Sequence, residues 1–255
     1  MRHIRFITCH PSKIGMFHKD NPFVVFLYFV LFASILIGTL AVRNYNTNYF
    51  SNEDIDYVIT TIEKNEVVNC EYKDYKITGA KTSIKNAPIE IRVLNEDKID
   101  NGGLIINLKE SSAELYYNYI KISNVEYKNM DSGCSFTFKE VKNNTNNYNF
   151  RYFMNYLFIN SNTGYASNVF LNNVLTAFMY YLIFGIVAVF IYSYFTNPYI
   201  VVNKRAKLVI YDSLIYFFVM TFTVIINVSF LQYVALFLPI VYCNFTFTHI
   251  IRVRK

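Results

Sequence analysis

Histidine is missing from the middle of the chain. All four histidines lie outside residues 43–168, so a histidine-based acid–base site is excluded there. The sequence also lacks the Gly-x-x-x-x-Gly-Lys phosphate loop, the His-Glu-x-x-His metal motif and the Gly-x-Ser-x-Gly nucleophile motif. No Cys-x-x-Cys pair or other His/Cys ligand spacing supports a zinc site. We therefore predict no catalytic residue, no metal and no cofactor, and we interpret the protein as a non-enzyme.

Charge is scarce and unevenly placed. Charged residues form 16% of the chain and hydrophobic residues 53%, which points away from a single soluble globule. The Lys and Arg that flank the hydrophobic blocks are Arg2, Arg5, Lys13, Lys19, Lys204, Arg205, Lys207, Arg252, Arg254 and Lys255. Residues 43–168 hold 14 Lys and Arg beside 16 Asp and Glu, a formal charge of −2. Because a nucleic-acid binder concentrates basic residues on its soluble domain, we predict no nucleic-acid partner.

The hydrophobic residues gather in long uncharged runs. At about 1.5 Å per residue, a helix of about 20 residues or more crosses a hydrocarbon core of about 30 Å. Inside lipid every backbone polar group must be satisfied within the segment, which favours helices over strands. We predict four transmembrane helices, over residues 22–42, 169–195, 208–228 and 229–251. The first run is too long for a signal-peptide core and lacks a good cleavage site, so we interpret it as a retained anchor.

The basic residues predict the orientation. The positive-inside rule places residues 1–21, the loop 196–207 and the tail 252–255 in the cytoplasm, and residues 43–168 outside. The protein is then a multi-pass plasma-membrane protein with both termini cytoplasmic. The N-terminal segment either forms a short helix on the inner leaflet or acts only as a basic flank. Lys204, Arg205 and Lys207 are predicted to lie at the membrane surface. The lipid bilayer is an expected partner, because each such residue attracts anionic lipid by about 1 kcal/mol.

Residues 43–168 have the pattern of a small α+β domain. Ser51, with Asp54 three positions on, predicts the start of a helix over Asn52–Asn65. The pattern then changes to period two, which predicts five strands: Glu71–Thr78, Ile89–Leu94, Leu104–Lys109, Ile122–Tyr127 and Ser135–Val141. Apolar residues between 150 and 158 predict a second helix leading toward residue 169. The predicted fold class is an α+β membrane protein, with an extracytoplasmic, mainly antiparallel β domain between transmembrane helices 1 and 2.

Two cysteines fall in the predicted outside domain. A disulfide between Cys70 and Cys134 would close a loop of about 65 residues, worth about 4 kcal/mol in the loop-entropy model. The alternative is a pair of buried thiols.

Two ionisable residues lie inside the predicted spans. Asp212 and His249 both lie near the cytoplasmic end of their helices, so they could meet and form an intramembrane polar site. The alternative is an interfacial ion pair of Asp212 with Arg205 or Lys207.

The order of the parts, together with local stretches, carries a family resemblance. The matching features are the stretch from His10 to Phe17, the single first span, the segments Pro88–Leu94 and Gly103–Leu108, and the terminal three-helix block. The chain resembles a family of small membrane proteins of low-GC Gram-positive bacteria whose function is unknown and some of which are named maltodextrin-utilisation proteins. The resemblance implies a plasma-membrane protein associated with carbohydrate uptake, and it carries over no functional residue.

Two classes of function follow from this organisation. The four spans show no internal repeat of the kind that transporters usually have. We therefore expect an accessory, scaffold or sensor protein that acts through a membrane-protein partner or as a homo-oligomer. A small transporter or channel subunit is the alternative.

Overall fold

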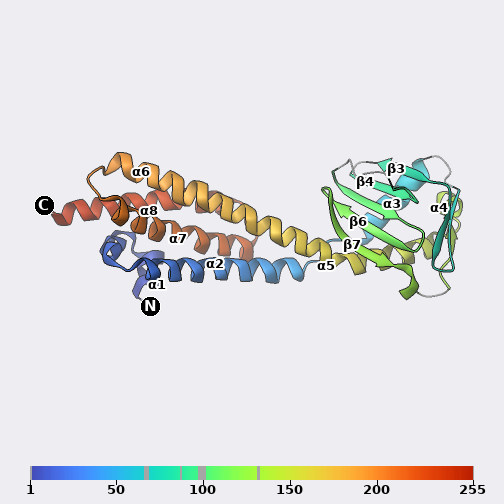
Figure 1. The fold of residues 1–255 in the computed structure, drawn as a ribbon, viewed down its shortest axis with the longest axis horizontal. Coiled ribbons are helices and arrows are strands. Elements are labelled where there is room, and N and C mark those ends of the chain that lie inside the picture. The colour runs from blue at the N-terminus through green and yellow to red at the C-terminus, as the bar shows by residue number, and fades with distance from the viewer. Residues whose placement is uncertain (1, 66–68, 87, 97–101, 131–132, 255) are drawn as a thin grey trace. The chain divides into compact units, whose positions relative to one another are not determined.

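The chain forms two compact units in a computed structural model that describes residues 2–65, 69–86, 88–96, 102–130 and 133–254. The helical unit consists of Met1–Asn46 and Phe170–Lys255, and the sheet unit consists of Thr47–Val169 (Figure 1). Helix α5, Asn147–Tyr180, contributes residues to both units. The protein is thus of the α+β class.

Helices make up the helical unit. They are α1 (Arg2–Cys9), the 3-10 helix η1 (Pro11–Lys19), α2 (Pro22–Tyr45), the end of α5, the π-helix η3 (Tyr181–Ala188), α6 (Val189–Thr196), α7 (Val202–Ile226) and α8 (Phe230–Arg254). Within the described residues, four helical runs are long and apolar enough to cross a membrane: Pro22–Tyr45, Asn147–Thr196, Val202–Ile226 and Phe230–Ile250. These runs contain the first two predicted transmembrane segments, 22–42 and 169–195, and overlap most of the other two, 208–228 and 229–251. They indicate a multi-pass membrane protein.

The third of these helices starts earlier than predicted. Helix α7 begins at Val202 rather than at residue 208, so Lys204, Arg205 and Lys207 lie in its first two turns. The loop between α6 and α7 therefore covers residues 197–201 rather than the predicted 196–207. Pro198 in this loop is incompatible with continuing helix α6. A hydropathy reading missed these two turns because their charged side chains end the apolar run, although the backbone is already helical.

Helix α7 is the centre of the helical unit. It packs against α2, α8, η1 and η3, and Tyr211, Leu214 and Phe217 are completely buried on it (Figure 1). Beside it lies an aromatic cluster made of Phe29, Phe178, Tyr181 and Phe217, with ring centroids 4.4 to 6.3 Å apart. Such ring pairs add stabilisation beyond their buried area.

The N-terminal segment is folded into this unit. Ile7, Ile14 and Phe17 belong to its buried core. A Cβ atom on Gly15 would lie only 2.7 Å from Cγ1 of Ile250, so η1 approaches α8 closely at this glycine. The main apolar side chains of the segment therefore face other helices of the same chain, a contact that neither predicted role included.

A five-stranded sheet and a three-stranded sheet form the framework of the sheet unit. The first has the order β3-β4-β5-β6-β7 and the second β2-β1-β8. The strands are β1 (Cys70–Lys73), β2 (Lys76–Gly79), β3 (Thr82–Asn86), β4 (Ile89–Val93), β5 (Leu104–Leu108), β6 (Ser112–Tyr117), β7 (Ile120–Glu126) and β8 (Phe136–Thr137). Only β4 and β5 pair in parallel among these strands, so the unit is mainly antiparallel, as predicted.

Helices cover one face of the five-stranded sheet. Helix α3, Asn52–Lys64, packs Val58 and Ile62 into the same core as Ile91 and Leu115 of the sheet. Its predicted start is confirmed: Ser51 and Asp54 form a reciprocal capping box. Helix α5 approaches β7 so closely that a Cβ on Gly164 would lie 1.9 Å from the carbonyl oxygen of Ile122.

Two predicted strands were wrong. The segment Glu71–Thr78 is a hairpin, with Asp74 and Tyr75 at positive φ in the turn between β1 and β2. The segment Ser135–Val141 contains only the short β8 before helix α4, Phe138–Lys142. Thr137 and Glu140 form a second capping box, which starts a helix where β-forming residues suggested a strand. Strands β3 and β6 were missed.

Candidate functional site

The N-terminal segment is tied to the two last helices by hydrogen bonds. The Tyr242 hydroxyl donates to the carbonyl oxygen of Thr8 at 2.9 Å. One turn further along α8, the Thr246 hydroxyl lies 3.0 Å from the carbonyl oxygen of Pro11. These contacts join residues more than 230 positions apart, so the first and last elements of the helical unit meet at one end. We call this the basic end, because it holds the N-terminal basic residues and the start of α7.

Asp20 fastens the same segment to α7. Its Oδ2 atom accepts hydrogen bonds from Tyr211 at 2.7 Å and from His3 Nε2 at 2.9 Å. The ammonium group of Lys207 donates to the backbone oxygen of Asp20 at 2.6 Å. Lys207, which was predicted to lie at the membrane surface, therefore anchors the chain just before α2.

Asp212 lies in the buried core of the helical unit, next to this network. Its side chain is fully buried, and its Oδ1 atom lies 2.6 Å from the Thr246 hydroxyl. Among the described residues Oδ2 has no hydrogen-bond partner. Thr246 thus has two oxygen neighbours but one hydroxyl hydrogen. Because the Pro11 carbonyl can only accept, both contacts are hydrogen bonds at once only when the Asp212 carboxyl donates to Thr246.

Asp212 and His249 do not form one site. Asp212 contacts Thr246 inside the unit, whereas the His249 side chain is exposed and lines a surface pocket. The described ion pairs also do not join Asp212 to Arg205 or Lys207, so the interfacial pair is not formed either. The sequence spacing located the polar residue on α7 but not its partner on α8.

Arg205, which was predicted to lie at the membrane surface, is buried inside the helical unit. Only 1% of it is exposed. Nη2 donates to the carbonyl oxygens of Asn197 at 2.8 Å and Ile200 at 3.1 Å, which fixes the loop between α6 and α7. The guanidinium also lies over the rings of Phe190 and Tyr194. Its Nε and Nη1 atoms find no hydrogen-bond acceptor within the described part of the chain.

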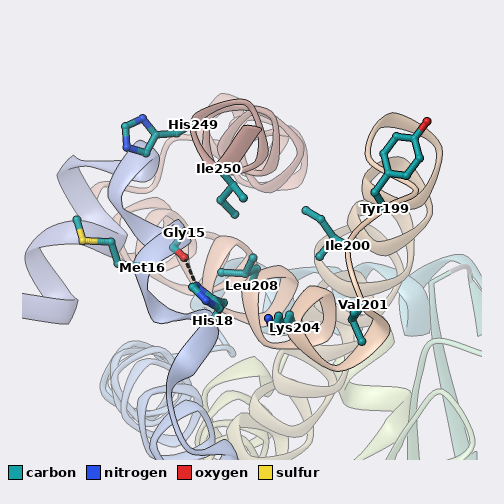
Figure 2. Close-up of a pocket in the computed structure, with 10 residues that line it drawn as sticks. All are labelled: Gly15, Met16, His18, Tyr199, Ile200, Val201, Lys204, Leu208, His249 and Ile250. Atoms are coloured by element: carbon teal, nitrogen blue, oxygen red, sulfur yellow. Dashed lines mark hydrogen bonds between the residues drawn. The ribbon is translucent and has the colours of Figure 1, made fainter. Parts of the chain in front are cut away.

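A pocket of about 380 Å³ opens between η1, the start of α7 and the end of α8. Figure 2 shows Ile200, Leu208 and Ile250 pointing toward its centre, with His18 and Lys204 along one margin. The backbone oxygen of Gly15 lies 2.8 Å from His18 Nδ1. Because a carbonyl can only accept, Nδ1 carries the hydrogen and leaves Nε2 for other contacts.

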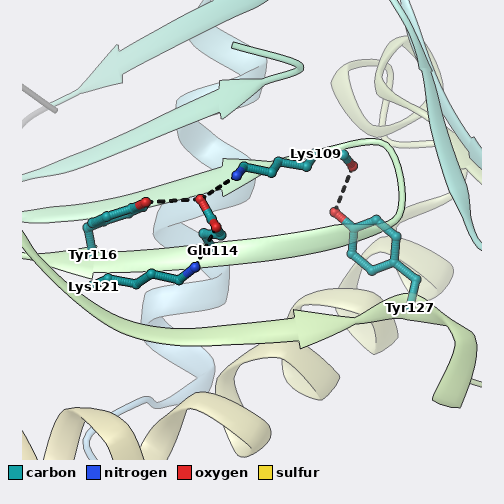
Figure 3. A network of polar contacts seen from close by, with 5 residues as sticks. All are labelled: Lys109, Glu114, Tyr116, Lys121 and Tyr127. Carbon is teal, nitrogen blue, oxygen red and sulfur yellow. Dashed lines mark hydrogen bonds and ion pairs between the residues drawn. The ribbon is translucent and has the colours of Figure 1, made fainter. Parts of the chain in front are cut away.

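Glu114 is the centre of a separate polar cluster on the face of the five-stranded sheet opposite the core (Figure 3). Its carboxylate accepts hydrogen bonds from Lys109 at 2.8 Å, from Tyr116 at 2.9 Å and from Lys121. Burial by itself would raise the pKa of Glu114, but these three donors outweigh burial and lower the pKa to about 2. A carboxylate held ionised in this way is a poor proton acceptor near neutral pH, which favours a structural role.

Cys70 and Cys134 are buried thiols and not a disulfide. The Cys70 thiol donates to the carbonyl oxygen of Ala80 at 3.1 Å, and the Cys134 thiol to that of Asn149 at 3.4 Å. Burial raises the pKa of the Cys70 thiol, which makes it less reactive. The structure thus has the second of the two alternatives.

Within the described ranges no cluster of three or more His, Cys, Asp or Glu side chains could hold a metal ion. The polar side chains described above fasten neighbouring segments of the chain: Asp20, Arg205, Asp212 and Thr246 in the helical unit and Glu114 in the sheet unit. Sequence reasoning missed Asp20, Tyr242 and Thr246.

Comparisons with protein-family models, with curated proteins and with solved structures found no match.

Proposed function

We propose that the protein is a non-enzymatic accessory, scaffold or sensor protein of the plasma membrane that acts through a membrane-protein partner or through copies of itself. The observation that carries the proposal is the aromatic cluster packed inside the helical unit. Phe29, Phe178, Tyr181 and Phe217 pack ring against ring between α2, η3 and α7. A solute path through these helices would require the rings to separate.

The outer faces of the spans support the same proposal. Of the four candidate spans, α7 alone has more than half of its most hydrophobic stretch buried. Large apolar side chains on α2, α5 and α8 therefore remain available to lipid or to another membrane protein, including Phe26, Leu175 and Phe237. In lipid such association is driven by packing rather than by the hydrophobic effect.

The proposal includes an orientation, with both termini cytoplasmic and the sheet unit outside. It is supported by the contacts at the basic end, because Lys207 reaches Asp20 and Tyr242 reaches Thr8. The N-terminal basic residues and those of α7 therefore share one end of the helical unit, which is the arrangement that the positive-inside rule requires. A link to carbohydrate uptake enters only through the family resemblance, so a sugar-transporter subunit is the first partner to seek.

The test is recovery of the partner. The tagged full chain is extracted in a mild detergent, purified by its tag and analysed by quantitative mass spectrometry. We expect one membrane protein, or a second copy of the chain, at a fixed stoichiometry. A monodisperse, partner-free monomer would contradict the proposal.

The second candidate, a small transporter or channel subunit, is favoured by a different observation. Arg205 and Asp212 are both buried on α7 and both carry polar atoms without described partners, and ionisable groups inside spans often mark solute or proton paths. This candidate predicts uptake of a labelled solute by proteoliposomes that contain the protein alone, and loss of that uptake in Asp212→Ala.

A further inference from the structure

We propose that the pocket at the basic end binds one anionic phospholipid from the surrounding bilayer. In this arrangement an acyl chain lies among Ile200, Leu208 and Ile250, and the phosphate lies beside Lys204 and His18. The inference does not depend on the proposed function, because it concerns a site within the helical unit alone.

The shape and lining of the pocket suit an amphiphile. Its volume of about 380 Å³ falls in the range of ligand pockets, which is about 300–1,000 Å³. The side chains at its centre are aliphatic, whereas its margin carries the nitrogen atoms of Lys204 and His18 (Figure 2). An occupant must therefore combine an apolar part with a polar, hydrogen-bond-accepting part.

Charge selects an anion. Among the described residues that line the pocket, Lys204, His18 and His249 have side chains that can carry a positive charge, and none is Asp or Glu. The Lys204 ammonium is exposed and makes no hydrogen bond or ion pair with the described residues, in contrast to Lys207, which is engaged with Asp20. His18 is turned by its bond to Gly15 so that Nε2 remains available. A phosphate group can accept hydrogen bonds from the Lys204 ammonium, and it can accept one from His18 Nε2 when the imidazole carries a hydrogen on both nitrogens.

Position identifies the bilayer as the source. Lys204 lies in the first turn of the span Val202–Ile226, and His249 lies at the end of the span Phe230–Ile250. The pocket therefore lies where two spans end, which is the level of lipid headgroups. Gly15 forms one wall because η1 is held against α8 there, so the docked N-terminal segment completes the site.

Native mass spectrometry of the full chain in detergent tests the proposal. The protein is mixed with equal amounts of phosphatidylglycerol and phosphatidylcholine, and we expect one phosphatidylglycerol to be retained in preference. Lys204→Gln should weaken this binding about five-fold, which corresponds to about 1 kcal/mol for one lysine near a lipid surface. Lys19→Gln is the matched control, because Lys19 is an exposed lysine of the basic end that does not line the pocket, and it should bind as the unchanged protein does.

A second pair of variants tests the acyl-chain part. Ile200→Trp places a large ring in the centre of the pocket and should abolish retention, whereas Phe195→Trp, at a position that is 79% exposed and outside the pocket lining, should not. Circular dichroism spectra check that each variant folds. Equal retention of both lipids, or equal binding by Lys204→Gln and Lys19→Gln, would overturn the proposal. It would also be overturned if water-soluble glycerol phosphate displaced the lipid at equal concentration, because the site would then recognise a headgroup without a chain.

Discussion

Replacing Thr246 by valine should release the N-terminal segment from α8. Valine keeps the shape of threonine but removes the hydroxyl, so Oδ1 of Asp212 and the carbonyl oxygen of Pro11 both lose their contact with it. A buried polar group left without a partner costs about 1–3 kcal/mol. If that cost falls on docking of the segment, its opened state becomes about 5- to 150-fold more populated.

Limited trypsin digestion of the full chain in detergent measures this population. Lys13 and Lys19 lie in η1 and are exposed at their side chains, but trypsin needs the backbone in an extended, opened form. When the segment recloses faster than it is cut, the cleavage rate reports the population of the open state. Thr246→Val should therefore be cut in η1 about 5- to 150-fold faster. Thr246→Ser keeps the hydroxyl and should be cut at nearly the original rate.

Two further variants separate this explanation from a general loss of stability. Thr248→Val makes the same chemical change on an exposed face of α8 and should leave the cleavage rate unchanged. Adding Asp212→Ala to Thr246→Val removes the stranded carboxyl and should recover part of the loss, because removing both partners costs less than removing one. Cleavage of Thr246→Val at the original rate, or of Thr248→Val at the same raised rate, would refute the reasoning.

Three more predictions concern other parts of the chain. Gly164→Ala should destabilise the sheet unit in thermal melts, because the new Cβ collides with a backbone carbonyl of β7, whereas Gly133→Ala, which meets nothing within 4 Å, should not. The pKa of Glu114 is lowered to about 2 from an ordinary 4.5, so its stabilising contribution is full above pH 4.5 and is lost as the pH falls toward 2. Melting temperatures of Glu114→Gln should therefore fall less over that interval; an equal fall would contradict the assignment. For orientation, an impermeant maleimide should label Lys128→Cys in intact cells but reach the exposed Cys9 only after permeabilisation; the reverse pattern would invert the topology.

Local signals predicted the elements that depend on neighbouring residues. The capping box at Ser51 and Asp54 predicted the start of α3 to the residue. The same signal at Thr137 and Glu140 was overlooked because the surrounding Phe and Val favour strands, and there the cap prevailed over the propensity. Length and apolarity located all four candidate spans, since those two properties are requirements of the bilayer itself.

The candidate site depended on contacts that no local pattern encodes. Asp212 was noticed because an acidic residue in a span is unusual. Its partner Thr246 has no unusual sequence feature and lies 34 positions away. The burial of Arg205 likewise depends on the carbonyl groups of a loop whose path is set by tertiary packing. Charge alone suggested an exposed side chain, and only the positions of its acceptors explain why Arg205 is buried.

The docked N-terminal segment has a consequence for how the protein is made. Thr8 and Pro11 are synthesised more than 230 residues before their partners Tyr242 and Thr246. At about 5–20 residues per second, the segment waits on the order of 10 to 50 s before α8 exists. The basic end therefore cannot close until α8 has been synthesised, and a ribosome that stalls before α8 leaves the earlier spans in place but the N-terminal segment without Tyr242 and Thr246.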